Sequence, residues 1–154
     1  MPSLRKRGGH LASDYEKRVR ESFARQAVMR LIGASITRVE PGQVQIELLT
    51  RPELTQQHGF LHAGIVTMLV DSACGYSALS MMPPGAAVLT VEYKVNFLSP
   101  ATGERLIARG RVIKPGQTLS VCLGEAYVQK DGEEKLVATM LATMITRLEK
   151  GMEG

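Results

Sequence analysis

The stretch Gln56-Gln57-His58-Gly59-Phe60-Leu61-His62-Ala63-Gly64 leads directly into an apolar run over residues 63–82. Asp71 is the only charged residue of that run, and two prolines follow it. The run predicts one helix, from 62 or 63 to 80, and because it is apolar on nearly every side the helix should be buried. A membrane span is disfavoured, because a charge lies near the centre of the run and glycine and hydroxyl residues dilute it.

The chain on either side of this helix is predicted to be rich in strands, with one further helix near the start. Runs of Val, Ile, Leu and Thr between turn residues indicate strands at 34–40, 43–50, 88–98, 104–114, 118–130 and 135–148. Apolar residues at helical spacing predict a helix from Asp14 to Ile32, with Ser13 or Asp14 as its cap and Gly33 after its end. A buried helix needs a cover, and an antiparallel sheet curved around it is the economical one. The sequence therefore predicts an α+β fold with an extra N-terminal helix.

Length and composition favour a single intracellular domain. At 154 residues the chain has the size of one domain, predicted over residues 13–150 after a flexible basic tail at 1–12. Its two cysteines form no Cys-x-x-Cys pair, which excludes a disulfide framework and favours a reducing compartment such as the cytoplasm. The net charge of +4 is dispersed and there is no Trp, so we expect no nucleic-acid partner. We expect no membrane partner either.

Small residues at the start of the central helix indicate an anion-binding site. The first amide N–H groups of a helix have no intrahelical partner, and the helix end carries about half a positive charge. Ala63 and Gly64 leave those amides open to an anion, or to an oxygen that becomes anionic in a transition state. An ordinary tight turn, in which His62 only caps the helix, explains the same pattern about equally well.

Asp71 is the second candidate. A carboxylate among apolar residues is unfavourable to bury without a partner or a role, and a desolvated carboxylate can attack or deprotonate. The alternatives are a helix face that reaches solvent or a structural hydrogen bond. Ala63 and Asp71 lie eight residues apart, about 12 Å along a helix, so one carbonyl cannot contact both in one chain. If they cooperate, Ala63 of one subunit faces Asp71 of another, and the protein is an obligate dimer.

Two other chemistries are disfavoured by the local sequence. His58 and His62 have the spacing of a zinc pair, but Gly59 lies between them before the helix begins, and no third ligand is evident. Cys74 and Cys122 lie in apolar segments without a basic neighbour, which is typical of buried structural thiols. We therefore expect no metal site and no cysteine nucleophile.

The segment Gln57–Gly64 at the start of the central helix, which we call the helix mouth, is followed by Asp71 nine residues after His62. Together with the run from Tyr93 to Pro100, it resembles the hotdog-fold acyl-CoA thioesterases. Weaker similarity at residues 103–106 and 114–118 extends the resemblance over about residues 34–147. The branch it resembles is the PaaI-like one, related to 4-hydroxybenzoyl-CoA thioesterase. The resemblance implies a sheet wrapped around one long helix. It also implies hydrolysis of an acyl-CoA to a carboxylic acid and free CoA, with no cofactor beyond the CoA of the substrate.

The resemblance also implies roles for individual residues. Asp71 matches the family's nucleophile or general base, and Ala63, after the motif histidine His62, supplies the oxyanion amide where the family usually has glycine. Gln56 matches an Asn or Gln that holds the thioester or the water, and Thr90 a hydroxyl that positions water. Substrate contacts are expected from two groups of residues: His58, Gly59, Phe60 and Gly64 at the helix mouth, and Lys114, Gly116, Gln117 and Thr118 from a neighbouring subunit.

The acyl group and the assembly are less determined by the sequence. A tunnel lined by residues such as Phe60, Leu61, Met68, Met81 and Met82 favours a medium or long aliphatic group, while an aromatic one stays open. We expect a homodimer that assembles further into a homotetramer.

Two other functions of the same fold stay open as alternatives. One is a hydratase or dehydratase, although Tyr76 stands where the hydratase pattern has His. The other is an acyl-CoA-binding module without catalysis, although residues 1–33 provide one long helix and not the helix-turn-helix of hotdog regulators.

Overall fold

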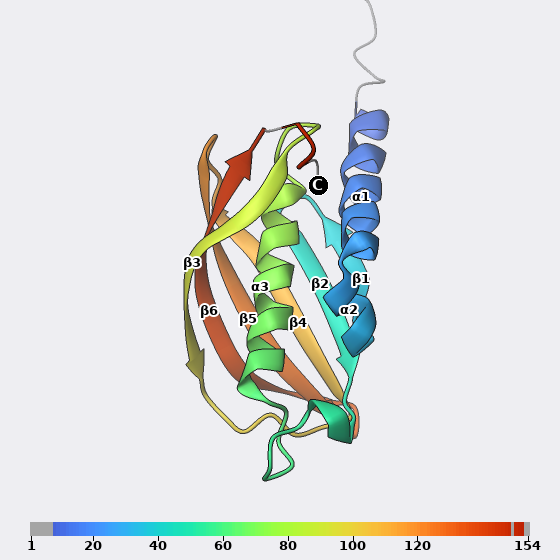
Figure 1. Cartoon of the computed structure of the whole chain (residues 1–154), viewed down its shortest axis with the longest axis vertical. Helices are drawn as coiled ribbons and strands as arrows, with labels where there is room; N and C mark the ends of the chain where they lie inside the picture. Colours follow the sequence, from blue (N-terminus) through green and yellow to red (C-terminus); the bar gives the residue numbers. More distant parts are fainter. Residues whose placement is uncertain (1–7, 149, 153–154) are drawn as a thin grey trace, which may run out of the picture.

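The apolar run forms helix α3 (Ala63–Leu79), and a six-stranded antiparallel sheet curves around it (Figure 1). A computed structural model describes residues 8–148 and 150–152. The remaining elements, in chain order, are α1 (Gly8–Arg25), α2 (Ala27–Ile32), β1 (Ser35–Glu40), β2 (Gln43–Leu49), the short 3₁₀ helix η1 (Pro52–Leu54), β3 (Ala87–Phe97), β4 (Arg105–Lys114), β5 (Leu119–Lys130) and β6 (Glu133–Arg147). The strand order is β1-β2-β4-β5-β6-β3, with every neighbouring pair antiparallel. The predicted α+β architecture with an N-terminal helix is confirmed.

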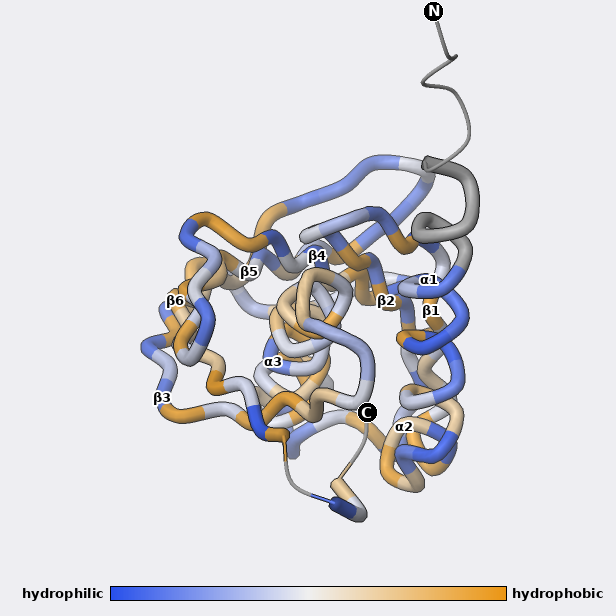
Figure 2. The backbone as a smooth tube through the Cα atoms, turned by 90° about the horizontal axis from the view of Figure 1, so that it is seen from above, coloured by the Kyte–Doolittle hydropathy of each residue, from blue (hydrophilic) through white to orange (hydrophobic). Residues whose placement is uncertain are grey.

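The sheet approaches α3 closely because two strands present glycines to it. Gly110 of β4 pairs with Gly124 of β5 in the sheet register. A Cβ atom at Gly110 would stand 2.3 Å from the Ala73 carbonyl oxygen, and one at Gly124 would stand 2.4 Å from a Val70 methyl group. No ordinary side chain fits at either position, so these glycines allow the helix backbone to rest directly on the sheet. Figure 2, a view from above, shows α3 enclosed by the curved sheet with α1 and α2 on the remaining side.

The N-terminal segment differs from the single helix predicted over 14–32. The first helix already begins at Gly8, so neither Ser13 nor Asp14 caps it, and residues 8–12 of the predicted tail are helical. Residues 1–7 of that tail lie outside the described residues. The helical conformation is interrupted at Gln26, whose extended backbone (φ −75°, ψ 97°) separates α1 from α2. The predicted stop is confirmed, because Gly33 ends α2 in the left-handed conformation.

Helix α1 is joined to the far end of α3 by one arginine. The Arg18 guanidinium donates to the carbonyl oxygens of Leu79 and Met82, at 2.8 and 2.7 Å. Carbonyls at the end of a helix lack intrahelical donors, so this contact satisfies polar groups that would otherwise be buried without partners. Phe23 adds an edge-to-face ring contact with Tyr76 of α3, with ring centroids 5.7 Å apart. These contacts hold α1 beside α3.

The first half of α3 and the neighbouring strand β3 are more exposed than the sequence predicted. The first half of the helix leaves Ala63 and Gly64 exposed and Thr67, Met68 and Asp71 half-buried. The neighbouring strand β3 ends the sheet, and it also exposes large apolar side chains, listed here: Leu89, Val91, Tyr93 and Phe97. An uncovered edge strand with apolar side chains is a ready surface for pairing with another chain. No helix within residues 8–148 and 150–152 combines the length and apolar character needed to cross a membrane.

Candidate active site

The backbone N–H groups at the start of α3 differ in whether they have a hydrogen-bond acceptor. His62 caps the helix, with its Nδ1 accepting a hydrogen bond from the Gly64 N–H at 2.9 Å. The backbone N–H groups of Ile65 and Val66 both donate to the His62 carbonyl oxygen. Within the described part of the chain the Ala63 N–H has no hydrogen-bond acceptor, and the residue is exposed. The capping role of His62 and an accessible amide, which the sequence left as alternatives, therefore occur together.

The loop before α3 places Gln56 next to that amide. Gln56 and Phe60 close a turn, in which the Gln56 N–H donates to the Phe60 carbonyl, and Gly59 adopts a left-handed φ of 82° inside it. The Gln56 side-chain oxygen accepts a hydrogen bond from the His58 N–H. Because the oxygen is held inside the loop, the amide NH₂ is the end of this side chain that remains as a donor. Gln56, Phe60 and Ala63 line one cavity of about 390 Å³, together with Phe97 at the end of β3.

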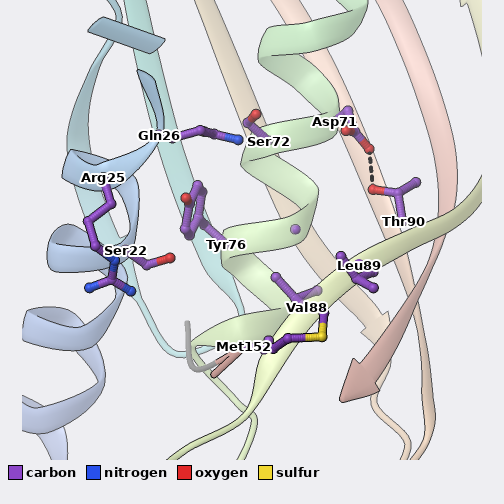
Figure 3. Close-up of a pocket in the computed structure, with 12 residues that line it drawn as sticks. Ser22, Arg25, Gln26, Asp71, Ser72, Tyr76, Val88, Leu89, Thr90 and Met152 are labelled. Carbon is purple, nitrogen blue, oxygen red and sulfur yellow. Dashed lines mark hydrogen bonds between the residues drawn. The ribbon is translucent and has the colours of Figure 1, made fainter. Parts of the chain in front are cut away.

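Asp71 lies two turns further along α3 and faces β3. Its Oδ1 accepts a hydrogen bond of 2.8 Å from the Thr90 hydroxyl (Figure 3). Burial raises the pKa of the Asp71 carboxyl above its usual range, and the Thr90 hydrogen bond lowers that pKa in part. The register of β3 against β6 shifts between Thr90 and Glu92, and such a bulge re-aims the side chains beside it. The result is a partly desolvated carboxylate held by one hydroxyl, at the open side of the molecule.

Asp71 and the Ala63 amide lie in two separate cavities of one chain. The Asp71 cavity also measures about 390 Å³, and it extends between α1, α3 and β3. The two cavities share no lining residue. The chain therefore carries two separate candidate half-sites, one with a helix N-terminus and one with a carboxylate, about 12 Å apart along the helix.

The structure brings together only some of the predicted substrate residues. His58, Gly59 and Phe60 lie in the loop with Gln56, next to the α3 N-terminus, but the Gly64 N–H is already bonded to His62. Gly116 and Gln117 line a different cavity with Met81 and Met82, beyond the C-terminal end of α3. The predicted tunnel residues are likewise distributed over three cavities: Phe60 and Leu61 in one, Met68 in the second, Met81 and Met82 in the third. Lys114 ends β4 and Thr118 lies in the same β4–β5 turn.

Several residues beside Asp71 were missed by the sequence reasoning. Ser22 comes from the last turn of α1, Gln26 from the break between α1 and α2, and Tyr76 from the next turn of α3, and all three line the Asp71 cavity (Figure 3). Nothing in the local pattern around residues 22–26 distinguishes them from surface helix positions. Only the docking of α1 against α3, to which the Phe23–Tyr76 contact contributes, brings Ser22 and Gln26 into the same cavity as the carboxylate.

Metal and thiol chemistry find little support in the geometry. Among residues 8–148 and 150–152, no three His, Cys, Asp or Glu side chains gather closely enough to hold a metal ion. Cys74 and Cys122 are buried free thiols, as expected. Burial raises the pKa of Cys122 to about 11 and that of Cys74 further still, so neither provides a thiolate near neutral pH.

Comparison with known proteins identifies a family for this geometry. The family model described as "Thioesterase superfamily" matches residues 58–135. The crystal structure of a thioesterase family protein from Silicibacter pomeroyi is 55% identical, covers 88% of this chain and 99% of its own, and superposes with a TM-score of 0.86.

More distant relatives agree with this match. Human acyl-coenzyme A thioesterase 13 is 32% identical over 93 residues, which are 59% of this chain and 66% of that protein. The E. coli PaaI protein is 20% identical, with a TM-score of 0.80 over 89% of this chain and 96% of its own, and this likeness shows the hotdog fold.

Proposed function

Because the chain belongs to the thioesterase superfamily and is a thioester hydrolase, we propose that it hydrolyses acyl-CoA thioesters at a site shared by two subunits. Asp71 of one subunit and the Ala63 amide of the other act on the same thioester. The observation that carries this proposal is the pair of uncompleted half-sites: an unpartnered helix amide beside Gln56, and a partly desolvated carboxylate beside Thr90. The relative named acyl-coenzyme A thioesterase 13 supports the choice of acyl-CoA as substrate.

The chemistry needs only these groups. The Ala63 N–H and the positive end of α3 stabilise the negative charge that develops on the thioester carbonyl oxygen. Asp71 either attacks the carbonyl carbon, forming an anhydride that water then hydrolyses, or takes a proton from the water that attacks. Either route breaks the carbon–sulfur bond and releases CoA as a thiolate. A thiol with a pKa of about 8.5 is a good leaving group, so no strong general acid and no cofactor are required.

The free edge of β3 supports the proposal that the two half-sites meet. A two-fold axis beside an edge strand pairs it antiparallel with its copy. Thr90, which contacts Asp71, lies in the first half of β3. Phe97, which lines the Ala63 cavity, is the last residue of the same strand. Antiparallel pairing therefore brings the Thr90 part of each β3 toward the Phe97 end of the other. It also covers the exposed apolar side chains of Leu89 and Val91, which are 46% and 53% exposed in the single chain.

The contacts to CoA are proposed from charge and position. His58 and Gly59 lie at the helix mouth, where the pantetheine thiol must end. Lys114, Gly116, Gln117 and Thr118 lie beyond the other end of α3, so they can contact the CoA only from a neighbouring subunit. A tetramer made of two β3-paired dimers is the assembly we propose for that contact.

The pH dependence of hydrolysis should report Asp71. Both routes need the carboxylate, so activity should rise with pH through the pKa of Asp71, and burial places that midpoint above the usual aspartate range. Thr90→Val removes the hydrogen bond that lowers this pKa. We expect the acid limb of the kcat/KM profile, measured from about pH 4 to 8, to move to higher pH in the variant. An unmoved or down-shifted limb would contradict the assignment.

The proposed function is tested by thiol release. Purified protein is assayed with propanoyl-, hexanoyl-, dodecanoyl-, benzoyl- and phenylacetyl-CoA, with released CoA detected by a thiol reagent and the mass of the acid product confirmed. We expect saturable release from at least one thioester. Saturable binding of all acyl-CoAs without release would favour a non-catalytic acyl-CoA-binding module.

A further inference from the structure

Gly75 is the least expected residue of α3. It lies in the interior of the helix, one turn after Asp71, where glycine is less favourable than alanine. The glycines at 110 and 124 are required because a Cβ would clash there with the helix. At Gly75 a Cβ would meet nothing closer than a Val88 methyl group at 3.9 Å, an ordinary contact. Packing therefore does not require this glycine.

What the missing side chain provides is space inside the Asp71 cavity. Gly75 lines that cavity between Asp71 and Tyr76, and Val88 and Leu89 of β3 form the facing wall. Figure 3 shows Asp71 and Thr90 at one side of the cavity and Ser22 and Tyr76 at the other. The open volume thus continues from the carboxylate, past Gly75, for about one helical turn, or 5.4 Å.

The far side of this cavity is polar. Tyr76 is only 7% exposed, and it lines this side of the cavity together with Ser22 of α1 (Figure 3). The other polar side chains that line the cavity are Arg25, Gln26 and Ser72. A purely aliphatic group pressed against this wall would remove water from the polar groups without replacing its hydrogen bonds, which is unfavourable. A group with an oxygen at that depth would replace them.

We infer that Gly75 is a specificity-determining residue: it lets the acyl group pass Asp71 and reach the Ser22–Tyr76 hydroxyl pair, so that acyl groups of about six atoms carrying a terminal oxygen are favoured. This inference rests on the proposed function for the position of the thioester, and it names the substrate class of that site. The predicted tunnel of Leu61, Met68 and Met82 has no part in it.

The test uses a graded series, Gly75→Ala and Gly75→Val, with Tyr76→Phe as a second variant. Substrates are propanoyl-CoA, hexanoyl-CoA and 6-hydroxyhexanoyl-CoA, and the non-hydrolysable thioether analogues of all three are used for calorimetric binding. Alanine and valine are acceptable in a helix interior, and Phe keeps the Tyr76 ring in contact with Phe23, so folding should be retained. Propanoyl-CoA, too short to reach residue 75, is the internal control for a folded site.

In the wild type we expect 6-hydroxyhexanoyl-CoA to exceed hexanoyl-CoA by about three- to tenfold in kcat/KM. Gly75→Val should reduce kcat/KM for both six-carbon substrates by about tenfold or more, and it should change kcat/KM for propanoyl-CoA by no more than about twofold. Gly75→Ala should give intermediate values of kcat/KM for the six-carbon substrates. Tyr76→Phe should bring the hydroxyl preference close to one. The thioether analogues should weaken in binding in the same order.

Other outcomes distinguish a failure of the proposed hydrolysis from a failure of the proposed role of Gly75. Binding that follows the expected series without any thiol release would support the acyl cavity and contradict the proposed hydrolysis. Release from all substrates with the same selectivity in wild type and Gly75→Val would keep the hydrolysis and overturn this inference, since the acyl group would then lie in the Phe60–Phe97 cavity.

Discussion

Replacing Asp71 with asparagine should lower kcat for thiol release by about 10³-fold while the protein stays folded and assembled. Asparagine has nearly the same shape and its side-chain oxygen can still accept the Thr90 hydrogen bond, so the change removes the negative charge and little else. Without a carboxylate the site has neither a nucleophile nor a base for water. KM should change much less than kcat, because Asp71 acts on the reacting atoms and not on the CoA.

The stability of the same variant provides an independent check. Because burial raises the pKa of Asp71 in the folded protein, its ionised form destabilises the fold at neutral pH. Asp71→Asn should therefore have a higher Tm than the wild type near pH 7. The difference should shrink as pH falls from the raised folded-state pKa toward the unfolded pKa of about 3.9, and it should vanish below that value, where the carboxyl is protonated in both states. A variant with full turnover would remove Asp71 from the mechanism, whatever its Tm.

Replacing Ala63 with proline should lower kcat by about 10²–10³-fold, because proline has no N–H to stabilise the oxyanion. The backbone conformation at residues 62 and 63 is compatible with proline at position 63. Ala63 is the first residue of α3, the helical position that proline tolerates best. The preceding residue, His62, has ψ of 136°, the extended conformation that a residue before proline adopts. The fold should therefore remain intact, as circular dichroism and Tm would show.

A matched control separates the amide from the side chain. Ala63→Gly keeps the N–H and restores the glycine usual in the thioesterases that this segment resembles, so it should retain wild-type kcat within a few-fold. If Ala63→Pro and Ala63→Gly lose activity equally, the loss comes from the helix start as a whole and not from the missing donor. Full activity in Ala63→Pro would place the oxyanion elsewhere.

Much of the fold could be predicted because its patterns are local. The run at 63–82 with a single charge predicts a buried helix, and turn residues such as Pro41-Gly42 and Asp131-Gly132 separate the strands, so their boundaries were predicted within about two residues. Gly33 could be recognised as a stop because an αL cap is a property of one residue. The break at Gln26 could not be predicted, because glutamine is a good helix former and nothing in the local sequence marks the extended backbone found there.

The candidate site likewise contains residues whose positions could be predicted from the local sequence and residues whose positions depend on tertiary packing. The positions of His62, Ala63 and Asp71 on the central helix could be predicted, because spacing along one helix determines where they lie; their roles in the site stay predictions. The cavity wall formed by Ser22 and Tyr76 was not found, since it depends on how α1 docks on α3. The exposed first half of α3 differs from the prediction of a buried helix, because in the single chain the strands and α1 cover mainly its second half.

The central claim, a site made by two subunits, is tested most directly by mixing two inactive variants. Asp71→Asn and Ala63→Pro chains carrying different affinity tags are co-expressed, and the mixed dimer is purified through both tags. In that dimer one site has Asp71 from the Ala63→Pro chain and an intact Ala63 amide from the Asp71→Asn chain. We expect about half the wild-type kcat per dimer, with both parent variants near background. If the two groups act within one chain, every site in the mixed dimer is damaged, and activity at the level of the parents would contradict the account.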